Sequence, residues 1–203
     1  MFNSRDLVLV SSFSAILLAY GAFSGVYLTP VIHSIDLFFL IATLFTILAL
    51  EIRQSWSATL LGTITGLIFF GTPGAPAPYH ITAALVGNGL TFDLVLRLMI
   101  KRTMPPSRVQ IVSAAAIGNF VMAIVGLSAL QLTVTITALQ WAVLVPVTVL
   151  LGVAGALFGL ALERRIRFTT RIPTRTLNVE ITTPQVRKFA EEEYNLLDGN
   201  NRS

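Results

Sequence analysis

The polar residues best able to do chemistry lie in or beside a strongly apolar stretch of this chain. His80, Asn88 and Asp93 fall in or next to the run 81–100, which has about the 20 residues that a membrane-spanning helix needs. At about 100° per residue, His80 and Asn88 lie near one face of such a helix. A buried amide must be hydrogen-bonded, either by another helix or by a ligand. This face is therefore a candidate ligand site.

Three residues of later segments can converge on the same cavity. Asn119 lies in the next apolar run, and Gln140 and Trp141 open the last one. We predict that a small-molecule ligand is bound by a set of five residues: His80, Asn88, Asn119, Gln140 and Trp141. Two alternatives stay open, because Asn119 serves equally well as a hydrogen bond between helices and Trp141 as an interfacial aromatic residue.

Asp93 and Arg97 are four residues apart, so they can pair on the surface of one helix. We interpret them as a structural or partner-docking pair. A proton-relay role for Asp93 is the alternative, but a nearby arginine would favour the ionised carboxylate.

No catalytic motif is present in the sequence. There is no GxxxxGK[ST] phosphate-binding loop and no HExxH zinc motif. The chain has no cysteine, which excludes a thiolate nucleophile, a thiolate metal site and a disulfide. We therefore predict a protein without enzymatic activity, metal or cofactor.

The composition is that of an integral membrane protein. Of 203 residues, 54% are hydrophobic and 12% are charged, and the mean hydropathy is +0.77, far above that of a soluble domain. The net charge of +4 comes from basic residues beside apolar runs. That placement serves insertion into a lipid bilayer, so we do not expect nucleic-acid binding.

The pattern predicts an all-α, six-helix membrane bundle with spans at 7–28, 35–50, 56–70, 81–100, 109–130 and 138–162. The third span is short, and a loop rich in proline and glycine, 71–78, follows it. In this topology, eight basic residues all lie on the same side of the membrane: Arg5, Arg53, Lys101, Arg102, Arg108, Arg164, Arg165 and Arg167. By the positive-inside rule, both termini should be cytoplasmic in a multi-pass protein of the cell membrane. Residues 1–167 form the transmembrane domain, and residues 168–203 form a cytoplasmic tail with a possible amphipathic helix at 185–197.

Small residues recur at helical spacing in the first and the last span. Ser11, Ala15 and Ala19 share one face of the first span. A second ladder closes the last span: Gly152, Gly155, Ala156 and Gly159. Small residues let two helices approach closely, and packing within the chain is the simpler interpretation of either ladder. Pro146 should bend or break the last span.

In combination, these features resemble the substrate-binding S component of energy-coupling factor (ECF) vitamin transporters. The resemblance covers residues 7–167 and rests on six spans, the sequence from Ala15 to Ala19, and the glycine-rich ending from Gly152 to Gly159 before a basic cluster. It implies a small vitamin or vitamin precursor bound near the outer surface. It also implies docking of the face with Ala15 and Ala19 on a transmembrane coupling subunit driven by two cytoplasmic ATPases. The histidine pattern of the nickel and cobalt members is missing, which favours an organic ligand.

Two other hypotheses remain. The chain could be a structural or assembly subunit of a larger membrane complex, in which small-residue faces and the tail make contacts and no ligand exists. It could also be a proton-coupled carrier working alone, although no clear inverted repeat relates its two halves.

Overall fold

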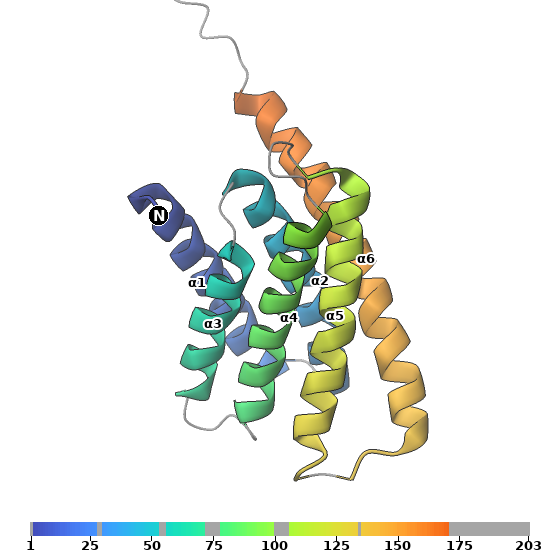
Figure 1. Cartoon of the computed structure of the whole chain (residues 1–203). Coiled ribbons are helices and arrows are strands. Elements are labelled where there is room, and N and C mark those ends of the chain that lie inside the picture. Colours follow the sequence, from blue (N-terminus) through green and yellow to red (C-terminus); the bar gives the residue numbers. More distant parts are fainter. Residues whose placement is uncertain are drawn as a thin grey trace, which may run out of the picture. The chain divides into compact units, whose positions relative to one another are not determined.

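The computed structural model describes residues 2–27, 30–52, 56–71, 78–99, 106–133 and 135–170. These residues form six helices (Figure 1). The all-α prediction is thus confirmed for the described part of the chain. The helices are α1 (Ser4–Tyr27), α2 (Pro30–Glu51), α3 (Ser57–Phe70), α4 (Pro78–Met99), α5 (Arg108–Leu130) and α6 (Ala138–Thr170).

Length and composition make the chain a multi-pass membrane protein. Four stretches of the described residues are long and apolar enough to cross a bilayer: 4–22, 79–99, 108–130 and 138–166. The short third helix is as predicted, since α3 is apolar but has 14 residues. Its length of about 21 Å is less than the hydrocarbon core of about 30 Å.

Two of the helices that begin earlier than the sequence pattern predicts begin at a proline. α2 starts at Pro30 instead of residue 35, and α4 starts at Pro78 instead of residue 81. Proline is well suited to the first helical position, because the amide hydrogen that it lacks would have no partner there. As a consequence, Tyr79 and His80 lie in the first turn of α4.

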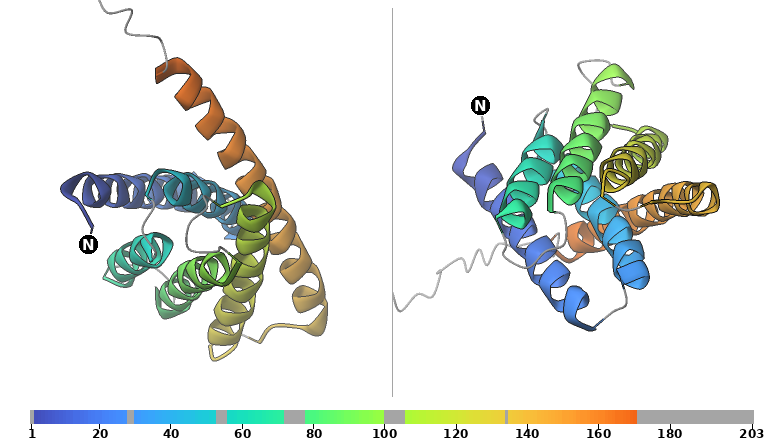
Figure 2. Two further views of the ribbon diagram at one scale, coloured as in Figure 1. Left: turned by 45° about the horizontal axis from the view of Figure 1, so that its top comes forward. Right: turned by 90° about the horizontal axis from the view of Figure 1, so that it is seen from below.

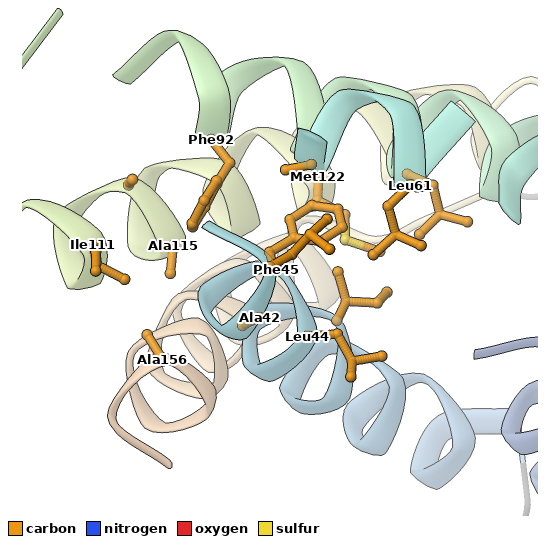
Figure 3. Packing of buried hydrophobic residues seen from close by; sticks show 14 of the residues in the cluster. Ala42, Leu44, Phe45, Leu61, Phe92, Ile111, Ala115, Met122 and Ala156 are labelled. Carbon is orange, nitrogen blue, oxygen red and sulfur yellow. The ribbon is translucent and has the colours of Figure 1, made fainter. Parts of the chain in front are cut away.

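The core is built around α2, in which every residue from 41 to 48 is buried. A helix that is apolar and buried on all sides lies in the interior of its bundle. Phe45 of α2 meets Phe92 of α4 with ring centroids 5.7 Å apart and an angle of 63° between the rings. Leu61 of α3 and Met122 of α5 complete this part of the core (Figure 3).

The glycines of α6 bring this helix against α2. Gly155 lies so close to the Phe39 carbonyl oxygen that a Cβ atom there would collide with it. A Cβ at Gly159 would lie 2.9 Å from the Thr43 carbonyl oxygen. Thr43 Oγ1 also donates a hydrogen bond to the Gly155 carbonyl at 3.1 Å. The small residues of the last span, the α6 ladder, therefore pack against another helix of this same chain.

α6 is longer than predicted, with 33 residues, and it continues through Pro146 without a break. The chain divides into two compact units, residues 1–164 and 165–203, so the end of α6 belongs to the second unit. The predicted tail helix at 185–197 lies outside the described residues. The same holds for most of the loop at 71–78 and for three of the predicted cytoplasmic cations, Arg53, Lys101 and Arg102.

Candidate functional site

Two of the five predicted ligand residues lie together in the interior of the first unit. Asn88 of α4 and Asn119 of α5 are each 1% exposed. The Asn88 side-chain amide donates a hydrogen bond to Asn119 Oδ1 at 3.0 Å. Asn119 Nδ2 in turn donates to the carbonyl oxygen of Thr148 on α6 at 3.1 Å and to that of Phe38 on α2 at 3.4 Å. One pair of amides thus connects four helices.

The remaining acceptor of this pair, Asn88 Oδ1, faces a glycine. It is buried without a hydrogen-bond partner among the described residues, and it lies against Gly118 of α5, where a Cβ atom would collide with it. Because Asn119 Nδ2 must point at two carbonyls, the network fixes the orientation of both amides. Asn88 and Asn119 therefore act together as hydrogen-bonding residues between helices.

Gln140 takes part in capping the start of its own helix, α6. Its Oε1 accepts the backbone N–H of Thr137 at 2.8 Å, and the Gln140 N–H donates to Thr137 Oγ1 at 3.3 Å. This reciprocal arrangement is a capping box, which satisfies amide groups that a helix start leaves without partners. Gln140 is exposed, whereas Asn88 is in the core.

His80 and Trp141 are both half-buried, in the first turns of α4 and α6. The Tyr79 ring lies edge-on to His80, with centroids 6.1 Å apart. The Tyr79 hydroxyl donates to Thr133 Oγ1, between α5 and α6, at 3.1 Å. The starts of α4 and α6 are thus at the same end of the first unit (Figure 1).

The predicted surface pair of Asp93 and Arg97 does not form. Asp93 is 7% exposed and its carboxylate accepts hydrogen bonds from the start of α3: from Thr59 N and Thr59 Oγ1, each at 2.7 Å, and from Ala58 N at 3.4 Å. The physical reason is that α3 begins without a side-chain cap of its own. A carboxylate on α4 takes that role and interacts favourably with the positive end of the helix dipole.

Arg97 lies over a different group. Its guanidinium carbon is 5.6 Å from the ring centroid of Trp56, the residue before α3. Trp56 has a left-handed backbone with φ of 77°, and the residue is 38% exposed. Both members of the predicted pair therefore contact the beginning of α3, and sequence spacing within α4 gave no signal for that contact.

The face of α1 with Ala15 and Ala19 is exposed, and so is Ser11. The opposite face carries Val10, Ser14, Leu17 and Gly21, all of which are buried. This buried face packs on α3, where Thr65 Oγ1 and Ser14 Oγ are 3.2 Å apart. α1 lies at one side of the first unit and contacts α2 and α3 (Figure 2).

Among the described residues, no group of three or more His, Asp or Glu side chains is arranged to hold a metal ion. The chain matches no protein-family model, no curated protein and no solved structure.

Proposed function

We propose that this chain is the membrane-embedded, ligand-binding subunit of an ATP-driven importer of the ECF type, for a small vitamin or vitamin precursor. The observation that carries the proposal is the exposure of Ala15 and Ala19 on α1. A shallow face of small residues suits close contact with a helix of a second membrane protein. The proposed partner is a transmembrane coupling subunit bound to two cytoplasmic ATPases.

We assign ligand contact to the end of the first unit where α4 and α6 begin. His80 and Trp141 combine aromatic surface with hydrogen-bonding groups, and both are half-buried. Such residues suit a small organic ligand, which needs apolar contact and a few polar groups that fix its orientation. Asn88 and Asn119 then hold the helices that support these two residues.

The proposed topology has six spans, with α2 and α3 completing the set and both termini cytoplasmic in the cell membrane. Because the chain has no cysteine, single cysteines can report sidedness directly. Thr135→Cys should react with a membrane-impermeant maleimide in intact cells, and Ser107→Cys should react only after permeabilisation. The reverse pattern would exclude this orientation.

Native mass spectrometry of the tagged protein, gently extracted from its own membranes, tests the function. We expect co-purification of a second membrane subunit, two ATPases and one bound small molecule. The double variant Ala15→Leu/Ala19→Leu should lose the protein partners and keep the small molecule. Ala154→Leu, a matched control at an exposed alanine on α6, should keep both. The variants His80→Ala and Trp141→Ala should lose the small molecule alone.

A second candidate function is an assembly subunit without a ligand. It is favoured by the amides of Asn88 and Asn119, which bond to each other and to helix backbones. Recovery with other membrane chains and with no small molecule would support this function and exclude the importer.

A further inference from the structure

The beginning of α3 and the last turn of α4 form a cationic, aromatic corner. Arg97 is exposed and its guanidinium carbon lies 5.6 Å from the centroid of the Trp56 ring. In a contact of this kind the ring attracts the cation through the negative face of its π-system. The N–H groups of the guanidinium stay available for an anion.

Nothing in the described part of the chain neutralises this cation. Asp93 is one turn away on α4, but its carboxylate is engaged by Ala58 and Thr59 of α3. No other carboxylate of the described residues forms an ion pair with Arg97. The corner therefore presents a positive charge at the end of a helix that is long and apolar enough to span a membrane.

An apolar strip leads along α4 to this corner. Leu90, Leu94 and Leu98 are 44%, 44% and 78% exposed, and their spacing of four places them along one side of the helix. At about 100° per residue, Arg97 lies between Leu90 and Asp93 around the helix, about 20° from Leu90. Arg97 is about 60° from Leu94 and about 100° from Leu98 around the helix, so it continues the line of Leu90 and Leu94, and Leu98 lies to one side of it.

We propose that Arg97, Trp56 and the strip of Leu90, Leu94 and Leu98 bind one anionic phospholipid. The lipid phosphate accepts hydrogen bonds from the guanidinium, which is matched in shape and charge to phosphate oxygens. An acyl chain lies along the leucines, and the Trp56 ring occupies the interface where tryptophan is favoured. Charge complementarity selects an anionic headgroup over a zwitterionic one. This site does not depend on the proposed importer function.

The experiment is native mass spectrometry of the full chain in detergent, titrated with phosphatidylglycerol or with phosphatidylcholine of the same acyl chains. We expect wild type to bind phosphatidylglycerol more tightly than phosphatidylcholine. Arg97→Gln should weaken phosphatidylglycerol binding about fivefold, since one cation at an anionic surface contributes about that factor. Arg97→Lys should keep an intermediate affinity, because it retains the charge and loses the planar donors.

The control is Arg108→Gln, which removes another exposed arginine, at the start of α5. It should bind the lipid as wild type does. Trp56→Leu tests the aromatic part with the charge retained and should weaken binding about twofold to fivefold. Inorganic phosphate at millimolar concentration should not displace the lipid, because the acyl chain contributes to binding.

The proposal would be overturned by wild-type affinity in Arg97→Gln, by an equal loss in Arg108→Gln, or by equal binding of the two lipids. Displacement by inorganic phosphate would also overturn it, since the corner would then be a site for a free anion.

Discussion

The two small-residue faces of this chain, on α1 and on α6, both have small residues at helical spacing, but their environments are opposite. On α6, Gly155 and Gly159 lie against carbonyl oxygens of α2. On α1, Ala15 and Ala19 are exposed. The spacing of small residues thus shows where two helices can approach each other, but the structure is needed to show whether the second helix belongs to the same chain.

The physics of the bilayer gives this difference its meaning. Lipid is as apolar as leucine, so a helix gains no hydrophobic free energy by burying a face against another helix. Close backbone packing and hydrogen bonds between helices are what remain. α6 uses both, through its glycines and through the Thr43 hydroxyl. The α1 face offers the same close approach without an occupant from the described residues, which is why it carries the proposed docking function.

The largest loss of stability is expected where the small residues of α6 pack against α2. Gly155→Ala introduces a methyl group against the Phe39 carbonyl oxygen, so α6 and α2 must separate. We expect a loss of about 2–3 kcal/mol in the free energy of unfolding, which is typical of overpacked contacts. The midpoint of thermal unfolding in detergent measures it. Unchanged stability would mean that the two helices are not in close contact, and the comparison would fail.

Much of the α6 contact could be predicted from sequence, because glycine at positions 152, 155 and 159 has few uses in a membrane helix other than close packing. All-α architecture followed from apolar runs of spanning length. The partner of each face could not be predicted, since period and composition describe one helix at a time. The sequence also indicates that Asn88 and Asn119 need hydrogen-bond partners. Only the structure shows that they bond to each other, because they lie on different helices.

The second effect is expected at the amide pair beside the α6 ladder, where a Cβ at Gly152 would lie 2.7 Å from Asn119 Nδ2. Asn119→Ala removes the acceptor for Asn88 and the donor to Thr148. We expect a loss of about 1–2 kcal/mol, the upper range for hydrogen bonds between membrane helices.

The double-mutant cycle with Asn88→Ala should give a coupling energy of about 0.5–1.5 kcal/mol. Strictly additive losses would show that the amides act separately, and the filled region would then be held by glycine packing alone.

A third test concerns α3, on which the buried face of α1 packs. Asp93→Ala removes the carboxylate that accepts from Ala58 and Thr59. Loss of a helix cap costs about 0.5–2 kcal/mol, and we expect about 1 kcal/mol here. Asp93→Asn keeps one carbonyl acceptor and should lose less.

Sequence spacing favoured a pair of Asp93 with Arg97, because the i, i+4 rule considers one helix and ignores a neighbouring helix that starts without a cap. If that pair mattered for stability, Arg97→Gln would destabilise the protein as much as Asp93→Ala. We expect the stability of Arg97→Gln to stay near that of wild type.

The smallest effect on stability is expected on the exposed face of α1. Ala15→Leu adds apolar volume where nothing in the described chain lies, so the purified protein should unfold within about 0.5 kcal/mol of wild type. A larger loss of stability would mean that α1 packs against this chain through that face, as α6 does. A stable Ala15→Leu protein that no longer retains a partner would separate the two uses of small residues. A larger residue on the α6 face would then destabilise the protein, whereas a larger residue on the α1 face would only release the partner. The small-residue face that packs inside the chain would thus serve folding, and the exposed one would serve assembly.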